Sequence, residues 1–439
     1  MTAGDAPNVP ARAADRNRPD RKRPAPILAI FLTVLIDMLG FAMFIPDLQL
    51  RGEGLVRNAL GLAPGVADPR VGLLIGLQIA AFSLAQLLLS PWLGRLSDRH
   101  GRRLVLRISS ALAVVAYLVY AFAPSLPFLV LSRALSGVAA ANLGVAFAYV
   151  SDVTEPKDRS KSLGLLGAAF GIGFIIGPSL GALLLRVSGD SPVLLGSVAA
   201  TLALINFLFI QFLVPESLPA ERRSGSRRFL ADLRVAFGSP TLRLLLVVFF
   251  MIQLGFTGLE TTFFRLLERP DWIFHYGRHA KDVGAYVLGA VGITAAIMQG
   301  GVIRRLPPGT DDRAVLRWAY LLFIPALALV PFTPLWFPGI LVSIALGIAN
   351  GLAQPTLSGL ISRNAPVTIL GGIFGITQAL GALARVLGPL LGNPLFELRP
   401  WLPYVAGAGL ACVPAFLVWT TKLSFRPAGT GEGDATPVH

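Results

Sequence analysis

Apolar residues occur along this chain in twelve long blocks, each separated from the next by a short polar segment. Each block approaches the roughly 20 apolar residues that a helix needs to cross a bilayer. Within a block the apolar positions surround the predicted helix on all sides, which is typical of helices that face lipid or are fully buried. The pattern predicts an all-α membrane protein with twelve transmembrane helices. The blocks lie at approximately 27–48, 71–91, 104–123, 128–150, 162–185, 192–214, 242–264, 283–303, 314–332, 335–358, 370–391 and 402–421.

Three short strings recur at nearly one spacing, which indicates an internal duplication. Leu39-Gly40-Phe41 recurs as Leu254-Gly255-Phe256, 215 residues later. Gly137 has a counterpart in Gly347 at an offset of 210, and Gly177-Pro178 has one in Gly388-Pro389 at an offset of 211. We therefore predict two pseudo-symmetric six-helix bundles around a central cavity. The expected division is a disordered basic tail at 1–26, bundles at 27–214 and 242–421, a cytoplasmic linker at 215–241 and a C-terminal tail at 422–439.

The composition argues against a water-soluble enzyme. Residues of the set AVILMFWYC make up 54% of the chain and only 14% of residues are charged, whereas about 25% are charged in an ordinary soluble domain. The blocks contain no nucleophile–base pair and no metal-ligand cluster, so we expect neither an enzyme nor a bound metal or other cofactor. Cys412 is the single cysteine, which excludes an internal disulfide.

The net charge of +14 does not require a nucleic-acid partner. With the N-terminus assigned to the inner side, 27 of the 38 Lys and Arg residues lie on or near the inner side and 9 on the outer side, and the remaining two are Arg133 and Arg385. Positive residues favour the cytoplasmic side of a membrane, so both termini are predicted to be cytoplasmic. The excess of Arg over Lys and the short outer loops favour a bacterial inner membrane.

The loop between the second and third blocks carries a dense motif, Gly94-Arg95-Leu96-Ser97-Asp98-Arg99-His100-Gly101-Arg102-Arg103. Glycine permits a tight turn, and an Asp at a helix end can face the positive N-terminus of another helix. The string resembles the signature of the major facilitator superfamily. The resemblance implies that Gly94, Asp98, Arg99, Gly101, Arg102 and Arg103 control conformational gating. It also implies that Asp98 meets the inner end of the eleventh helix and that Arg102 pairs with Asp152, contacts that would lock the outward-facing state.

The fifth block presents glycines at helical spacing. Gly173, Gly177 and Gly181 lie at i, i+4 and i+8 and form one smooth face, and Pro178 can kink the helix. Spacing alone indicates close helix packing. The string also resembles the antiporter motif of the drug:proton antiporters in this superfamily, with Ala182 in place of its last glycine. That resemblance implies exchange of a proton for a drug-like compound, with these residues involved in gating.

Asp37 is a carboxylate inside the first block. It lies nine residues before Pro46, or about 14 Å along a helix at 1.5 Å per residue, which places it near the middle of the bilayer. A carboxylate there is costly unless it is paired, solvated or protonated. Protonation is the simplest route to neutrality, so Asp37 is the main candidate for a proton carrier, and a partnered packing residue is the alternative.

Arg133, Glu260 and Arg385 are the other charged residues singled out within the blocks. Counted from the outer ends of their helices, all three share a depth in the outer half of the membrane. Unpaired charges there are costly, so we expect Glu260 to neutralise at least one arginine. Such a cluster would serve as an outer gate or an anion-binding site. Arg133 also resembles the intramembrane arginine of proton-coupled members, and its alternative is an arginine that snorkels to the outer surface.

Uncharged polar residues within the blocks are predicted to line the cavity, with hydrogen bonding between helices as the alternative for each. These residues are Gln78, Gln86, Asn142, Gln299, Asn350, Gln354 and Gln378.

The first half resembles the bacterial tetracycline efflux proteins, and parts of the second half resemble eukaryotic tetracycline-transporter-like organic anion carriers. Ala116 stands where the tetracycline exporters carry an Asp, and all four histidines fall in loops or the tail, which counts against tetracycline–magnesium as cargo. We expect a monomeric secondary transporter that exports small amphipathic organic molecules by alternating access, with the proton as coupling ion. The alternatives are an organic anion carrier or uniporter that uses Arg133 and Arg385, and a membrane scaffold or receptor.

Overall fold

The structure is a computed structural model of the chain. It describes residues 26–421 except 64–65, 67, 155–158, 219–228, 271, 273, 308–309, 335–336 and 367–369. The predicted tails, apart from Pro26, and part of the predicted linker lie outside the described residues.

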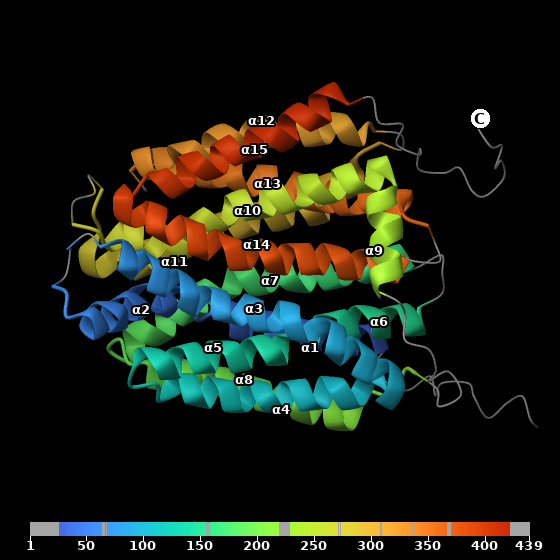
Figure 1. Cartoon of the computed structure of the whole chain (residues 1–439), viewed down its shortest axis with the longest axis horizontal. Helices are drawn as coiled ribbons and strands as arrows, with labels where there is room; N and C mark the ends of the chain where they lie inside the picture. The colour runs from blue at the N-terminus through green and yellow to red at the C-terminus, as the bar shows by residue number, and fades with distance from the viewer. Residues whose placement is uncertain are drawn as a thin grey trace, which may run out of the picture.

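The described chain is built from long helices that run roughly parallel to one another (Figure 1). Eleven described segments are long and apolar enough to cross a membrane, and α7 supplies the remaining member of a twelve-helix arrangement. The prediction of an all-α membrane protein is confirmed. The helices before the linker are α1 (Pro26–Ala42), α2 (Ile45–Leu60), α3 (Pro69–His100), α4 (Arg102–Ala121), α5 (Leu126–Ala140), α6 (Leu143–Val153), α7 (Arg159–Val187) and α8 (Pro192–Leu213). Those after it are α9 (Phe229–Gly238), α10 (Pro240–Glu268), α11 (Ala280–Ile297), α12 (Asp312–Leu329), α13 (Phe337–Asn364), α14 (Leu370–Leu398) and α15 (Leu402–Thr420).

Two of the spans are interrupted helices. The first span consists of α1 and α2, and α2 begins with Pro46 in its first turn, where the missing N–H of proline costs no helical hydrogen bond. The helix α2 continues to Leu60, well past the end of the predicted block. Arg51 and Glu53 therefore lie on a helix at the outer end and not in a loop. The fourth span consists of α5 and α6, which are separated by Ala141 and Asn142.

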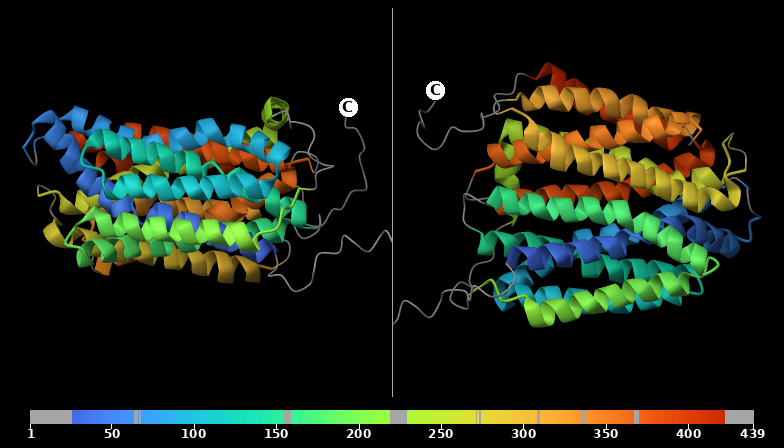
Figure 2. Two further views of the ribbon diagram at one scale, coloured as in Figure 1. Left: turned by 90° about the horizontal axis from the view of Figure 1, so that it is seen from below. Right: turned by 180° about the vertical axis from the view of Figure 1, so that it is seen from behind.

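The packing of the helices repeats in the two bundles (Figure 2). In the first bundle α1 packs on α7, α3 on α5, and α4 on α8. In the second bundle the corresponding pairs are α10 on α14, α11 on α13, and α12 on α15. The bundles meet where α3 packs against α14 and α7 packs against α11. This arrangement confirms the predicted pair of pseudo-symmetric bundles.

The repeated glycines explain why the same pairs form twice. A side chain at Gly137 would collide with the carbonyl oxygen of Phe82, and one at Gly347 would lie 2.6 Å from the carbonyl oxygen of Val291. Both glycines therefore allow the fourth helix of a bundle to approach the second. A side chain at Gly173 would lie 2.5 Å from Cβ of Met38, so the glycine face of α7 is its contact with α1.

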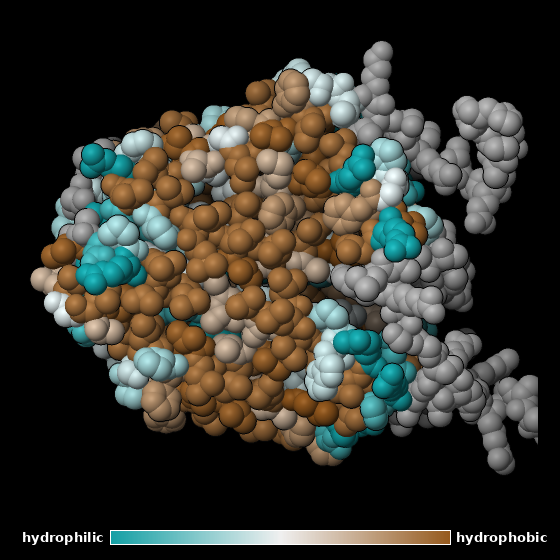
Figure 3. All heavy atoms as spheres, viewed as in Figure 1, coloured by the Kyte–Doolittle hydropathy of each residue, from teal (hydrophilic) through white to brown (hydrophobic). Residues whose placement is uncertain are grey.

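The surface shows how the molecule sits in a membrane. Apolar side chains form a broad band over the middle of the visible face, and polar side chains gather toward its two ends (Figure 3). Large apolar side chains such as Phe212 and Phe416 are exposed on this molecule. Exposed apolar surface on this scale is expected of helices that face lipid.

Candidate functional site

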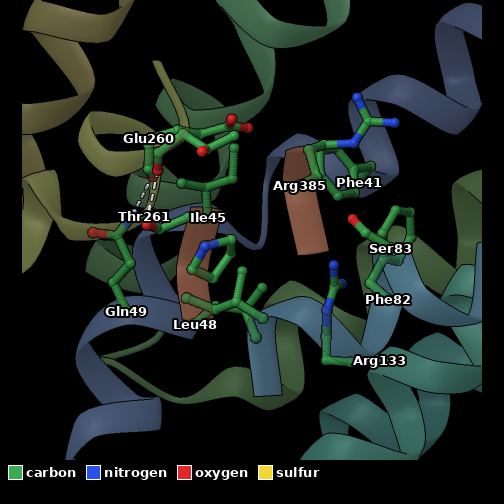
Figure 4. A pocket seen from close by; sticks show the side chains of 13 residues that line it. Phe41, Ile45, Leu48, Gln49, Phe82, Ser83, Arg133, Glu260, Thr261 and Arg385 are labelled. Carbon is green, nitrogen blue, oxygen red and sulfur yellow. Dashed lines mark hydrogen bonds between the residues drawn. The ribbon is translucent and has the colours of Figure 1, made fainter. Parts of the chain in front are cut away.

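A pocket lies between the two bundles, and side chains from both bundles form its walls (Figure 4). The first bundle supplies Phe41, Ile45, Leu48, Gln49, Ile79, Phe82, Ser83 and Arg133, and the second supplies Thr257, Glu260, Thr261, Arg385 and Pro389. Because its two walls belong to different bundles, any relative movement of the bundles changes the shape of this pocket.

Arg133 enters the pocket from α5 and is only 2% exposed. Its guanidinium carbon lies 4.7 Å from the ring centroid of Phe82 and 5.7 Å from that of Phe41. These contacts are cation–π interactions, which partly compensate a cation that has left water. The Nε atom of Arg133 has no hydrogen-bond partner in the described part of the chain. Burial at this depth contradicts the alternative of an arginine that snorkels to the outer surface.

Glu260 and Arg385 share this pocket with Arg133, as their common predicted depth requires. The expected neutralisation by direct pairing is not observed: the ion pairs found among the described residues include none between Glu260 and either arginine. Nη2 of Arg385 instead lies 3.4 Å from Oε1 of Gln86, whose amide donates to the carbonyl of Ala140. Depth along a helix had located the three side chains, but it does not specify their direction around the helix. The pocket therefore holds two guanidinium groups and one carboxylate.

The seven uncharged polar residues predicted to line the cavity do not line this pocket. Gln78 donates to the carbonyl of Leu48, and Gln354 donates to Gln253, so these amides join helices. Gln299 lies on a π-helical turn, Met298–Val302, close to Gly171 on α7. Asn142 donates to Asp37, Gln86 accepts from Arg385, and Asn350 and Gln378 are half-buried elsewhere. Within helices that are polar at only a few positions, most amides satisfy each other or the backbone.

The polar lining that sequence reasoning missed consists of Gln49, Thr257 and Thr261. A signal for Gln49 exists in the sequence. Phe41, Ile45 and Gln49 follow one another at intervals of four residues and therefore share a helix face. The predicted first block ended at residue 48, so Gln49 fell outside it.

Asp37 occupies a second polar site, separate from the pocket lining. Its Oδ1 accepts a hydrogen bond from Nδ2 of Asn206 at 3.0 Å, and its Oδ2 accepts one from Nδ2 of Asn142 at 3.3 Å. Asn142 lies in the interruption between α5 and α6, and Asn206 lies on α8. The carboxylate is thus partnered by two amides, of which the sequence had indicated only Asn142, and only as a cavity residue.

The signature loop is tied together at the inner end of the first bundle. Nε of Arg102 lies 3.1 Å from Oδ2 of Asp152, as the resemblance implied, and its Nη1 lies 2.5 Å from Oδ1 of Asp98. Glu216, which sequence reasoning missed, accepts hydrogen bonds from the backbone N–H groups of Arg102 at 2.8 Å and Arg103 at 3.2 Å. This carboxylate therefore caps the N-terminus of α4.

Other expectations for this loop are only partly met. Asp98 was expected at the inner end of the eleventh helix, but its ion pair in the described residues is with Arg102; residues 367–369, which precede α14, lie outside the described residues. Gly101 has φ 99°, a conformation that favours glycine, and a side chain there would collide with Glu216. A Cβ atom added at Gly94 would have no neighbour within 4 Å, and Arg99 is exposed.

Comparison with known proteins agrees with this architecture. The family model described as Major Facilitator Superfamily matches residues 27–389. The chain belongs to the major facilitator superfamily. It is 30% identical to the mouse "Major facilitator superfamily domain-containing protein 10" over 98% of this chain and 99% of that protein. It is 29% identical to the class B tetracycline resistance protein of Escherichia coli over 89% of this chain and 97% of that protein.

A solved structure of the same superfamily is similar over most of its length. The crystal structure of the human organic anion transporter MFSD10 (TETRAN) covers 90% of this chain and 100% of its own, with 27% identity and a TM-score of 0.69. Members of the superfamily are transporters and not enzymes.

Ion pairs between the bundles of this superfamily member gather at one end, the end at which α2 finishes. Glu53 pairs with Arg265 at 2.6 Å and Asp190 pairs with Lys281 at 2.6 Å, in each case across the two bundles. Longer contacts join Arg57 to Glu397 at 3.9 Å and Arg186 to Asp282 at 3.8 Å. These ion pairs join the two bundles at this end, which is the outer one on the topology predicted from Lys and Arg.

The ion pairs between the bundles bear on the interpretation of the signature loop. The contact between Arg102 and Asp152 is present together with those ion pairs. The expectation that this contact locks the outward-facing state stays a prediction. A contact that holds the two bundles together needs a partner in each bundle, whereas Arg102 and Asp152 both lie in the first bundle.

Proposed function

We propose that this transporter moves amphipathic organic anions across the membrane by alternating access. The observation that carries the proposal is the charge of the pocket: its lining holds Arg133 and Arg385 but a single carboxylate, Glu260, and the ion pairs of the described residues join neither arginine to it. The description of a similar protein as an organic anion transporter supports the proposal. The sequence had favoured efflux of amphipathic compounds in general and had kept an organic anion carrier as the alternative.

The pocket suits a molecule with an anionic group and an apolar body. The guanidinium of Arg133 can donate paired hydrogen bonds to a carboxylate or sulfonate. The rings of Phe41 and Phe82 lie beside it with centroids 4.7 Å apart and offer apolar surface to the rest of the substrate. Thr257, Thr261 and Gln49 on the facing side supply neutral polar contacts. Two bundles that rock about this pocket would expose it to each side in turn.

Ligand-induced thermal stabilisation tests the proposal. Purified protein is heated with fluorescein, an aromatic anion, or with tetraphenylphosphonium, a lipophilic cation. We expect the anion to raise the unfolding temperature. Substitution Arg133→Ala should weaken the anion's apparent affinity about 10- to 100-fold, because a charge-assisted hydrogen bond contributes about 1.5–3 kcal/mol. Arg70→Ala is the matched control, since Arg70 pairs with Asp68 at the surface. Stabilisation by the cation alone would overturn the proposal.

A second candidate function is proton-coupled antiport, with Asp37 as the proton carrier. It is favoured by the two amides that hold the Asp37 carboxylate and by the glycine string Gly173-Phe174-Ile175-Ile176-Gly177-Pro178, which resembles the antiporter motif. Proteoliposomes with an imposed pH gradient distinguish antiport from uniport. Coupling predicts that the gradient drives substrate accumulation and that Asp37→Asn abolishes accumulation but leaves exchange at equal pH. A uniporter would show no response to the gradient.

The pocket is complete within one chain, so a monomer suffices for either function.

A further inference from the structure

Gln49 makes an unusual pair of contacts between the bundles. It lies on α2, is 2% exposed, and reaches across to α10 (Figure 4). Its Nε2 donates a hydrogen bond to the carbonyl of Glu260 at 2.8 Å, and its Oε1 accepts one from the backbone N–H of Phe264 at 2.9 Å. One side-chain amide thus satisfies two backbone groups on the opposite bundle.

The two backbone groups are a matched pair in helix geometry. In an α-helix the N–H of residue i bonds to the carbonyl of residue i−4, so the N–H of Phe264 and the carbonyl of Glu260 would ordinarily bond to each other. Gln49 bridges the two groups of that one hydrogen bond. α10 is one continuous α-helix from Pro240 to Glu268. The turn that Gln49 contacts carries Glu260 in the wall of the pocket.

This geometry makes the contact easy to release. Separating two buried polar partners is normally costly, because each is left without a hydrogen bond. When α2 withdraws from α10, however, the carbonyl of Glu260 and the N–H of Phe264 have each other as helical hydrogen-bond partners. Only the amide of Gln49 then needs new partners, and it faces a pocket that has become open to water. The contact can therefore hold the bundles together without trapping them.

We propose that Gln49 is the latch of the outer gate of this transporter. Gln49, Glu53 and Arg57 are spaced four residues apart and form one face of α2, and all three contact the second bundle. Gln49 is the innermost of them and the one that lines the pocket. The latch closes the outer side at the level of the pocket, and the ion pairs of Glu53 and Arg57 close it farther out. This role does not depend on the chemical class of the substrate.

Thiol accessibility tests the latch. The reporter is Ser83→Cys in the pocket, in a Cys412→Ala background that leaves no other thiol. A membrane-impermeant maleimide is added from the outer side. We expect Gln49→Leu to increase the labelling rate about tenfold, the population shift that corresponds to about 1.4 kcal/mol. Gln78→Leu is the control, because Gln78 also donates to a backbone carbonyl, that of Leu48, but within the first bundle. An unchanged rate for Gln49→Leu, or an equal increase for Gln78→Leu, would overturn the proposal.

A second variant tests the bidentate contact and covers the case in which Gln49→Leu does not fold. In Gln49→Glu a protonated carboxyl can still donate to one backbone group and accept from the other, whereas an ionised carboxylate can only accept. Labelling should therefore be slow at acidic pH and fast at alkaline pH, relative to the Gln49 reporter measured at the same pH. If the ratio of these two labelling rates does not change with pH, the proposed latch is contradicted.

The protein with Gln49, labelled at the same pH, is the reference for the labelling rate, because other titratable and charged groups lie around position 49. These are Glu53 on α2, Glu260 and Arg265 on α10, Arg133 on α5 and Arg385 on α14. All of these groups are the same in the two proteins. The ratio of the Gln49→Glu labelling rate to the Gln49 labelling rate at one pH therefore reports the effect of the new carboxyl group.

Discussion

Glu53 on α2 and Arg265 on α10 form an ion pair, with 2.6 Å between Oε2 and Nε, and this pair joins the two bundles at their outer end. Arg265 also contacts Glu397 and donates a hydrogen bond to Asn393 at 3.0 Å, and both of these partners are buried on α14. Arg265 is therefore anchored within the second bundle, and Glu53 is the partner that must leave when the outer side opens. The proposed alternating-access cycle would break that contact in every turnover.

Glu53→Gln should favour the outward-open arrangement. Arg265 keeps Glu397 as a counter-charge, so the fold tolerates the change, while the bundles lose a charge-assisted contact. We expect outer-side labelling of a Ser83→Cys reporter to rise about tenfold or more, since such contacts contribute about 1.5–3 kcal/mol. Asp68→Asn is the control, because Asp68 pairs with Arg70 inside one bundle. Equal labelling of the two variants would exclude a gating role for Glu53.

Gly137→Ala should destabilise the first bundle. The added methyl group would collide with the carbonyl oxygen of Phe82, and overpacking of this kind costs about 1–3 kcal/mol. The thermal unfolding temperature in detergent measures the effect. Gly144→Ala is the matched control, since no atom lies within 4 Å of a Cβ at that position and alanine is the better helix former. A lower unfolding temperature for Gly144→Ala than for Gly137→Ala would contradict the packing argument.

Asn206→Leu should impair transport through its effect on Asp37. The change removes the 3.0 Å hydrogen bond to Oδ1 and leaves the carboxylate with Asn142 alone. Hydrogen bonds to charged groups contribute about 1.5–3 kcal/mol, so we expect the proteoliposome transport rate to fall roughly 10-fold or more. Asn364→Leu, which loses only a bond within its own helix, should retain activity. In an Asp37→Asn background the additional loss from Asn206→Leu should disappear, and a full loss there would show that Asn206 acts independently.

Glu216 should prove to be a stabilising cap of α4. Glu216→Ala removes the acceptor for the N–H groups of Arg102 and Arg103, and loss of an N-terminal cap costs about 0.5–2 kcal/mol. Glu216→Gln keeps one acceptor oxygen without the charge. The unfolding temperature should therefore decrease in the order wild type, Glu216→Gln, Glu216→Ala, and the two variants unfolding together with wild type would rule out the cap.

Much of the architecture could be predicted because bilayer crossing imposes strong local requirements. A block of about 20 apolar residues has few alternatives to a membrane helix, since backbone groups in lipid must bond within their own segment. The glycine strings predicted the duplication because close helix crossings demand the smallest residue at a fixed register. The same reasoning did not identify Glu216 or Asn206, whose partners lie more than a hundred residues away in the sequence.

The sequence by itself determined the number of spans, the duplication, the family signature and the location of Asp37, Arg133, Glu260 and Arg385 within predicted spans, because each depends on composition or on spacing along one helix. Only the tertiary structure decided how those charges are arranged. It placed Arg133, Glu260 and Arg385 around one pocket and Asp37 between two amides outside it. It also placed Gln49 on the backbone of α10. These relationships depend on the rotation of each helix about its axis and on the approach of the two bundles, and both are set by packing between segments that are distant in the chain.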